Sequence, residues 1–293
     1  MNNNLPEVRR KKLKQALKNK KHLRVLEASN GLTGIIVENT KVGDKEFDAM
    51  WLSSLCDSTI KGKPDNESVD FSSRVRTIEE ILEVTSKPII VDGDTGGKTE
   101  HFIYNIRTLE RLGVSAVIIE DKKGLKHNSL LENSEQTLED KEIFAEKIRQ
   151  GKSSLQSDDF MIIARLESFI AGKDINDALD RAEAYINAGA DGIMIHSKKE
   201  DGKEILDFIS QFKNKYNNIP LVLVPTTYNH FKDTQLFNLG ADIVIYANQL
   251  LRSSYKIMNI VAEKILQDES SEGVSKNYCA SLEEILQITG DCK

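Results

Sequence analysis

The sequence predicts an α/β protein: a (β/α)8 barrel of the TIM type, followed by one extra C-terminal helix. Two observations favour this fold. Continuously apolar runs, typical of strands buried on both faces, alternate with helical segments along most of the chain. These strand–helix units number about eight, which is the count of such a barrel. The length of 293 residues also suits one barrel.

The order of elements is read from the periodicity of apolar residues and from the polar breaks between them. A polar loop passes through residues 61–65, and the helix at 174–187 places Ile175, Ala178, Leu179, Ala182 and Ile186 on one face. The other predicted helices are 31–39 and 75–84, and the predicted strands are 23–28, 47–52, 88–91, 117–119, 161–164, 193–195, 221–224 and 243–245.

Three glycines mark helix ends. Gly113, Gly189 and Gly240 each precede a strand by a few residues. Glycine closes a helix in the left-handed conformation without a steric penalty, so each is predicted to end a helix. The helical and strand pattern breaks only after Asp268, and a last helix is predicted at 282–288. The expected domains are therefore 1–268, a catalytic barrel with a basic N-terminal helix, and 269–293, a linker and C-terminal helix.

Composition limits the partners of the chain. Its net charge is −6, which argues against nucleic acid as a partner. The basic segment from Arg9 to Lys21 carries Leu13, Ala16 and Leu17 at helical spacing, which favours a packed helix over a nucleic-acid or membrane surface. No apolar run is long enough to span a membrane, and the N-terminus lacks a signal-peptide pattern. The 3 cysteines lack metal-type spacing, so we expect a cytoplasmic protein.

Acidic residues follow two successive predicted strands. Asp92 and Asp94 come directly after 88–91, and Glu120 comes directly after 117–119. Carboxyl ends of parallel strands meet at one edge of a barrel, and carboxylates gathered there repel one another unless a cation neutralises them. The pattern predicts a Mg²⁺ site, because Mg²⁺ prefers oxygen ligands. The alternative is that these acids cap helices or pair with lysines.

Other polar residues are predicted to share this edge, called the rim below. Arg165 and Glu167 follow the strand at 161–164, and His196 follows the one at 193–195. Together with the acids and Ser53 and Ser54, they suit a small, strongly anionic substrate. Arg165 would alternatively be a structural partner of Glu120 or Glu167, and His196 a core histidine.

The segment 121–135, called the lid below, is polar and has no periodicity. Lys126, Asn128 and Ser129 lie in it, close after Gly124. Long loops over the carboxyl end of a barrel often close active sites, so these three side chains are expected to close on a charged ligand. The alternative is a solvated loop with a helix N-cap.

These motifs resemble the phosphoenolpyruvate mutase family of the isocitrate lyase/phosphoenolpyruvate mutase superfamily. The resemblance covers residues 26–252, and its most specific parts are Asp92-Gly-Asp-Thr-Gly96 and Glu120-Asp-Lys-Lys-Gly-Leu-Lys-His-Asn-Ser129. It implies Mg²⁺-dependent interconversion of phosphoenolpyruvate and phosphonopyruvate, an isomerase step of phosphonate biosynthesis. It also implies a homodimer or homotetramer in which the C-terminal helix is swapped between subunits.

The resemblance also assigns roles to residues. It implies that Asp92 lies nearest the metal and that Asp94 and Glu120 hold its waters. Asp65 matches an aspartate on the metal and substrate side. Substrate binding falls to Trp51, Ser53, the backbone of Ser54 and Leu55, and Asp92. The groups implied to hold the phosphoryl and to close the site are Arg165, His196, Lys126, Asn128 and Ser129.

Two departures from the family pattern leave substrate contacts open. Gly97-Lys98 stands where many members carry an aromatic residue and a glycine, and Ser54 stands where glycine is common. Phosphonopyruvate hydrolase is the main alternative, although its lid tends to carry threonine at the position of Asn128. A carbon–carbon lyase or decarboxylase and a non-catalytic barrel are further alternatives.

Overall fold

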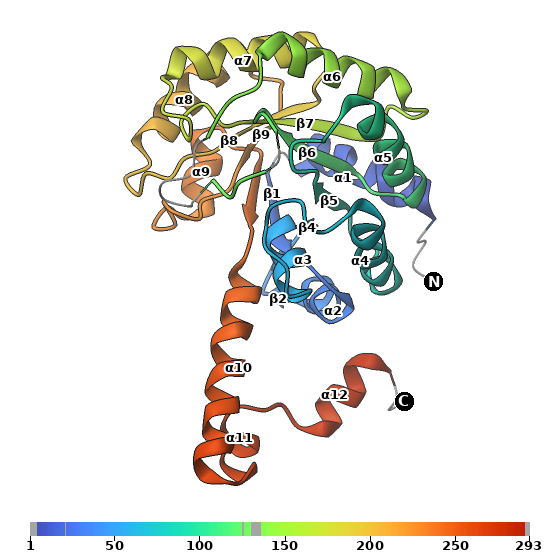
Figure 1. The fold of residues 1–293 in the computed structure, drawn as a ribbon, viewed down its shortest axis with the longest axis vertical. Helices are drawn as coiled ribbons and strands as arrows, with labels where there is room; N and C mark the ends of the chain where they lie inside the picture. Colours follow the sequence, from blue (N-terminus) through green and yellow to red (C-terminus); the bar gives the residue numbers. More distant parts are fainter. Residues whose placement is uncertain (1–4, 21, 125, 130–135, 291–293) are drawn as a thin grey trace. The chain divides into compact units, whose positions relative to one another are not determined.

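Eight parallel strands form a closed barrel in the computed structural model, which describes residues 5–20, 22–124, 126–129 and 136–290 (Figure 1). Around the barrel the order is β1-β10-β9-β8-β7-β6-β5-β4. The predicted (β/α)8 barrel is confirmed. The barrel strands are β1 (Leu23–Glu27), β4 (Ala49–Leu52), β5 (Ile89–Asp92), β6 (Ala116–Glu120), β7 (Met161–Leu166), β8 (Gly192–Ile195), β9 (Leu221–Leu223) and β10 (Ile243–Tyr246).

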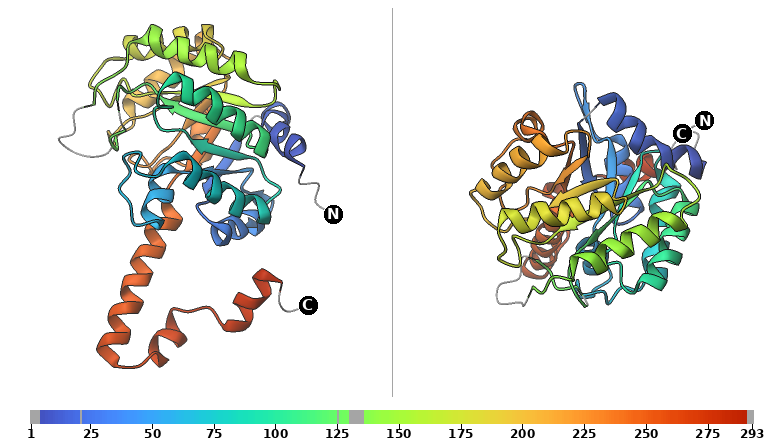
Figure 2. Two further views of the ribbon diagram at one scale, coloured as in Figure 1. Left: turned by 45° about the vertical axis from the view of Figure 1, so that its right-hand side comes forward. Right: turned by 90° about the horizontal axis from the view of Figure 1, so that it is seen from above.

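Helices surround this sheet, and α5, α6, α7 and α8 follow one another along its outside (Figure 2). The helices of the barrel unit are α1 (Pro6–Lys20), α2 (Gly31–Asn39), α3 (Ser54–Ile60), α4 (Phe71–Val84), α5 (Thr99–Leu112), α6 (Lys141–Ser154), α7 (Ile175–Asn187), α8 (Lys203–Lys215) and α9 (Asp233–Leu239). Two short elements of this unit were not predicted. They are α3 and the hairpin of β2 (Lys41–Val42) and β3 (Lys45–Glu46).

The three glycines at predicted helix ends have the expected backbone. Gly113 follows α5 with φ +87°, and Gly189 and Gly240 also have positive φ. At Gly113 the constraint is steric as well, because a Cβ there would lie 2.6 Å from Cα of Pro6. Left-handed glycines therefore turn the chain from helix to strand.

Helix α1 closes the end of the barrel at which the strands begin. Leu13 is fully buried in the core cluster that contains Leu23 and Ile243, the first residues of β1 and β10. Ala16 and Leu17 pack against the same cluster, so the predicted one-sided packing is confirmed. The basic side chains of α1 bind backbone carbonyls: Arg9 donates to Thr85 O at 3.0 Å, Arg10 to Glu110 O at 2.6 Å and Lys12 to Ser86 O at 2.6 Å.

By its contacts the chain divides into two units, Met1–Ala247 and Asn248–Lys293. The sequence predicts a boundary after Asp268 instead, because a helical pattern continues up to that residue. That pattern is α10 (Gln249–Asp268), which contacts α11 (Glu272–Asn277) and so falls in the C-terminal unit. The helix predicted at 282–288 is α12 (Leu282–Thr289). Among the described helices, none combines the length and apolar character needed to cross a membrane.

Candidate active site

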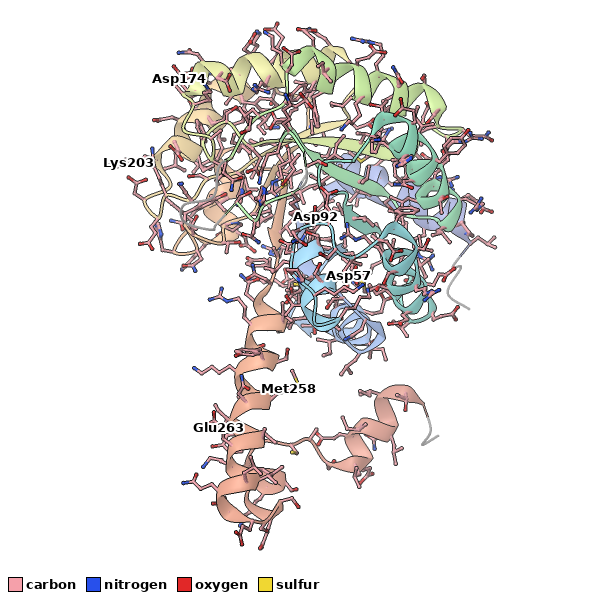
Figure 3. All side chains as sticks on the ribbon, in the orientation of Figure 1. Asp57, Asp92, Asp174, Lys203, Met258 and Glu263 are labelled. Atoms are coloured by element: carbon pink, nitrogen blue, oxygen red, sulfur yellow. The ribbon has the colours of Figure 1, made fainter. Side chains whose placement is uncertain are left out.

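The rim at the carboxyl ends of the strands holds buried charged side chains. Asp92 ends β5 and is labelled in Figure 3, and Glu120 ends β6; each is at most 6% exposed. The register of β6 and β7 places Glu120 beside Arg165. Strand order and register thus bring together the acidic residues Asp92 and Glu120 and the basic residue Arg165, which lie far apart in the sequence, as predicted.

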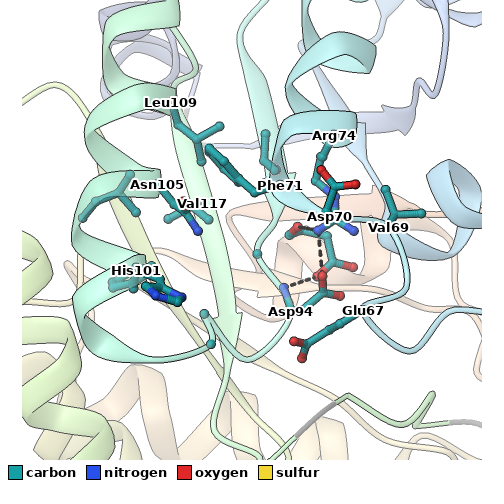
Figure 4. A pocket seen from close by; sticks show the side chains of 17 residues that line it. Glu67, Val69, Asp70, Phe71, Arg74, Asp94, His101, Asn105, Leu109 and Val117 are labelled. Carbon is teal, nitrogen blue, oxygen red and sulfur yellow. Dashed lines mark hydrogen bonds and ion pairs between the residues drawn. The ribbon is translucent and has the colours of Figure 1, made fainter.

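The turn after β5 is strained and firmly held. Asp94 has φ +52°, a conformation that non-glycine residues rarely adopt. Its carboxylate accepts a hydrogen bond from Arg74 Nη1 at 2.7 Å and one from Lys126 Nζ at 2.9 Å, and Figure 4 shows Arg74 of α4 reaching it. Arg74 also donates to the carbonyl of Asp92 at 2.7 Å. Backbone strain of this kind persists where the surroundings fix it, commonly at functional sites.

The lid is anchored at its two ends. Lys122 and Leu138 form an antiparallel bridge, and the N–H of Lys123 donates to Thr137 O at 2.9 Å. Inside the lid, Lys122 Nζ donates to His127 O at 2.8 Å. Residues 125 and 130–135 of the predicted lid lie outside the described residues. The described residues 126–129 lie against the rim, as the contacts below show.

Lys126 places its ammonium group among the acids of the rim. Its Nζ lies 2.9 Å from Asp94 Oδ1 and 3.4 Å from carboxylate oxygens of both Asp92 and Asp65. It also donates to the hydroxyl of Ser54. Burial alone would lower the pKa of Lys126, but Asp92 and Asp94 raise this pKa well above its usual value. The side chain therefore stays charged and neutralises the aspartates.

Asn128 of the lid contacts the same part of the site. Its amide nitrogen donates to Asp65 Oδ2 at 2.9 Å. Asp65 lies in the loop before α4, and its other carboxylate oxygen is the one near Lys126. The structure therefore brings together the four predicted residues Asp65, Asp92, Lys126 and Asn128.

Within the described part of the chain, no group of three or more His, Cys, Asp or Glu side chains is arranged as a metal site. Between Asp92 and Asp94 lies the ammonium of Lys126. Glu120 instead lies 3.4 Å from Arg165 Nη1 and 3.3 Å from Lys122 Nζ. Both carboxylate oxygens of Glu120 are nevertheless buried without a hydrogen-bond donor. Burial raises the pKa of Glu120 to about 7, against the opposite effect of Arg165.

Arg165 and His196 form the cationic side of the rim. Arg165 Nη2 lies 2.9 Å from His196 Nδ1 and donates to Ser129 Oγ at 2.9 Å. Burial and the neighbouring guanidinium lower the pKa of His196, which favours the neutral ring. A guanidinium can only donate, so its contact favours a ring that accepts at Nδ1 and carries its proton on Nε2. That proton is then available to an anion in the site.

The predicted carboxylate-binding turn lies at the start of α3. Ser53 caps this helix, and Ser54 donates through its hydroxyl to Asp92 Oδ2 at 2.8 Å. Ser54 begins a helix and is not among the residues with positive φ, so serine fits here without backbone strain. Leu55 follows and is half-buried. Trp51, at 3% exposure, belongs to the apolar core cluster of the barrel.

Besides Arg74, two further residues hold this region and were not identified from the sequence. Glu67, with φ +64°, accepts hydrogen bonds from the hydroxyl of Thr95 at 3.1 Å and from the N–H of Lys126 at 3.0 Å. Lys147 of α6 donates to the carbonyls of Thr95 at 2.9 Å and Gly97 at 2.8 Å. The sequence did carry a signal for Lys147: it is a charged residue on the face of α6 that is otherwise apolar and buried. For Glu67 we find no local signal.

A cavity of about 250 Å³ lies beside the rim, between α4 and α5 (Figure 4). Asp92 and Asp94 line it, as does Gly97, but Arg165 and His196 do not. Gly97 has φ +63°, and a Cβ there would meet no atom within 4 Å. Gly97 therefore borders open space beside the Asp92–Asp94 turn.

Known proteins share this fold. The sequence profile described as Phosphoenolpyruvate phosphomutase matches residues 13–266. A phosphoenolpyruvate phosphomutase of Tetrahymena pyriformis is 35% identical over 280 residues, which cover 95% of this chain and 90% of the relative.

Two solved structures superpose on nearly the whole chain. Phosphoenolpyruvate phosphomutase from Streptomyces platensis subsp. rosaceus has a TM-score of 0.89 at 31% identity, covering 96% of this chain and 94% of that one. A phosphonopyruvate hydrolase complex with oxalate and Mg²⁺ has a TM-score of 0.87 at 30% identity, covering 97% and 95%. With its rim and lid in place, this chain belongs to the phosphoenolpyruvate phosphomutase family.

Proposed function

We propose that this enzyme is an isomerase that interconverts phosphoenolpyruvate and phosphonopyruvate. The observation that carries the proposal is the position of the lid. Lys126, Asn128 and Ser129 contact Asp94, Asp65 and Arg165, so the described residues 126–129 of the lid lie closed on the rim. A closed site protects a phosphoryl group in transit from water.

We propose Mg²⁺ as the cofactor, bound near Asp92 with Asp94 and Glu120 holding its waters. The donors are carboxylate oxygens, the ligand type that Mg²⁺ prefers. The two buried Glu120 oxygens without hydrogen-bond donors suit water molecules around such an ion. A relative's structure, described with oxalate and Mg²⁺, supports the choice of metal. When bound, the ion would neutralise negative charge on the enolate oxygens of the substrate.

In the proposed reaction the phosphoryl group moves within one molecule. The bond from phosphorus to the C2 oxygen breaks and a bond from phosphorus to C3 forms, while C2–O becomes a carbonyl. Arg165, the Nε2–H of His196 and Asn128 would hold the phosphoryl, which passes through a loose, metaphosphate-like state. The turn of Ser53, Ser54 and Leu55, with Trp51 beside it, would hold the substrate carboxylate.

Lys126 would neutralise negative charge during this step, and Asp65 would hold the lid closed. The ammonium of Lys126 lies among the acids of the rim and would neutralise them as the lid closes. Asp65 accepts the Asn128 amide and thereby keeps the lid in place over the substrate. Ser129 would complete the closure at Arg165.

A phosphonopyruvate hydrolase is the second candidate, because a hydrolase structure superposes almost as well as the mutase. The two activities separate in one experiment. Phosphonopyruvate and Mg²⁺ are mixed with the enzyme and followed by ³¹P NMR. Phosphoenolpyruvate as the product is the expected result, whereas inorganic phosphate as the main product would assign the enzyme as a hydrolase.

We also propose a cytoplasmic homodimer or homotetramer that acts in phosphonate biosynthesis. The support is the C-terminal unit, in which no described residue of α10 or α12 is buried. Apolar residues are exposed on both helices, including Met258 at 62%, Leu266 at 81% and Leu282 at 82%. Exposed apolar surface of this kind favours burial against a second subunit, as a swapped helix would provide. Light scattering at micromolar concentration would measure the assembly, and a monomer would contradict it.

A further inference from the structure

Glu167 directly follows β7 and is fully buried, yet the proposed chemistry gives it no contact with substrate. Its Oε1 accepts from Nε of Arg165 and lies 3.3 Å from His196 Nδ1. Its Oε2 accepts the hydroxyl of Ser129 at 2.7 Å. One carboxylate thus binds Arg165 with one oxygen and the lid with the other. Through Arg165, whose Nη2 lies against His196 Nδ1, it also fixes the position of the histidine.

Ser129 is the matching contact on the lid. Besides donating to Glu167, its Oγ accepts from Arg165 Nη2 at 2.9 Å and from Lys122 Nζ at 2.8 Å. These distances can be met together only when the lid lies on the rim, because Ser129 belongs to the lid and Arg165 to β7. Closure therefore adds two bonds to the pair Arg165–Glu167, one to each partner.

A second layer fixes Glu167 from behind. Its backbone N–H donates to Asp121 Oδ1 at 2.9 Å, and Asp121 Oδ2 accepts from Tyr185 at 2.8 Å and Arg181 at 3.2 Å. Arg181 also donates to Glu139 O at 3.0 Å, just beyond the lid. Glu167 is therefore connected to Asp121 at the start of the lid, and through Arg181 of α7 to Glu139 just beyond its end.

We propose that Glu167 is a positioning residue that couples closure of the lid to alignment of Arg165 and His196. This inference rests on the proposed function for its kinetic consequences, while the closure itself is testable without turnover. In the open state Glu167 would lose the Ser129 contact. Arg165 would then be held by Glu167 but no longer by Ser129. In the closed state Arg165 is held by Glu167 through Nε and by Ser129 through Nη2.

The test compares Glu167→Gln, Ser129→Ala and the double variant. A misaligned phosphoryl-binding pair is expected to lower kcat on the order of a hundredfold in Glu167→Gln, with a much smaller change in KM. Because the bond between Ser129 and Glu167 is lost in either single variant, the Ser129→Ala change should have a clearly smaller effect in the Glu167→Gln background than in the unmodified enzyme. Independent, multiplying effects of the two changes would overturn the proposal.

Closure is read separately by trypsin cleavage after Lys123, an exposed residue of the lid. Oxalate with Mg²⁺ serves as the probe, since both occupy a relative's structure. We expect the probe to slow this cleavage on the order of tenfold in the unmodified enzyme and hardly at all in Glu167→Gln. Equal protection in both would contradict the coupling. If the enzyme forms no phosphoenolpyruvate, the proposed function fails, while this readout still decides the role of Glu167.

The matched control is Glu204→Gln. Glu204 of α8 binds Ser197 and Lys199 near the rim, away from Arg165 and Ser129. This variant should keep normal kcat and normal protection by oxalate. A melting temperature for each variant establishes that it is folded, so a loss confined to Glu167→Gln reports positioning.

Discussion

The two ends of the barrel differ in the kind of side chain that they bury. At the end where the strands begin, Leu13 of α1 seals an apolar core, and the basic residues of the helix bind backbone carbonyls. At the rim, charged side chains such as Asp92, Lys126 and Arg165 are buried together. Apolar burial stabilises the fold directly, whereas buried ion pairs contribute little net stability because desolvation offsets their attraction.

The two ends of the sheet therefore have separate roles: the α1 end stabilises the fold, and the rim carries the chemistry. Substitutions at the α1 end should unfold the protein without changing the reaction of the folded fraction. Substitutions at the rim should change the reaction while the fold survives. The following predictions test that division, from the largest expected effect to the smallest.

Asp92→Ala should reduce turnover by roughly a thousandfold or more, because it removes the rim carboxylate proposed to lie nearest Mg²⁺. Mg²⁺ binding, measured by calorimetry, should be lost with it. The circular dichroism spectrum should stay native. Near-normal turnover in this variant would remove Asp92 from the proposed site.

Leu13→Ala should cost about 2 to 5 kcal/mol of unfolding free energy, because it leaves a cavity in a fully buried site. Urea denaturation measures this loss. The folded fraction should keep the kcat of the unmodified enzyme, since α1 lies at the other end of the strands. A large fall in kcat at full folding would break the proposed division between the two ends.

Arg165→Lys should weaken transition-state binding by about 2 to 4 kcal/mol, read as kcat/KM. Lysine keeps the charge but cannot reach Ser129, His196 and Glu167 at once as the planar guanidinium does. Unchanged kinetics would show that the phosphoryl is held elsewhere and that Arg165 is structural.

Ser54→Gly should have the smallest effect, about 0.5 to 1.5 kcal/mol in kcat/KM, the value of one hydrogen bond. The change removes the hydroxyl that donates to Asp92 and restores the residue common in the family. Steady-state kinetics with varied Mg²⁺ would measure it. A hundredfold loss would mean that Ser54 has a direct catalytic role.

Much of the barrel followed from local pattern, whereas much of the rim did not. Apolar runs and the glycines at 113, 189 and 240 carry their own signal, because strand burial and left-handed turns depend on neighbouring residues. Acids that follow strands are visible for the same reason. Glu67 gave no such signal. Arg74 stands on the buried face of α4, but its partner could not be predicted, because its contact with Asp94 joins distant parts of the chain.

Helix α3 and the division after Ala247 were missed for related reasons. A short polar helix such as Ser54–Ile60 lacks a long periodic stripe, although Ser53 is a suitable N-cap. The boundary falls before α10, where the helical pattern itself is unbroken. The division depends on which residues α10 contacts in the folded chain, and the sequence does not give these contacts.

The central claim is that the closed lid keeps a transferring phosphoryl away from water. The most direct measurement is product partitioning by ³¹P NMR in Asn128→Ala at saturating phosphonopyruvate, with Asn105→Ala as a control on α5 outside the rim. We expect Asn128→Ala to slow the reaction strongly, by about 2 to 3 kcal/mol, and to release part of the flux as pyruvate and phosphate. The control should give phosphoenolpyruvate alone. An unchanged rate without phosphate release in Asn128→Ala would contradict the claim.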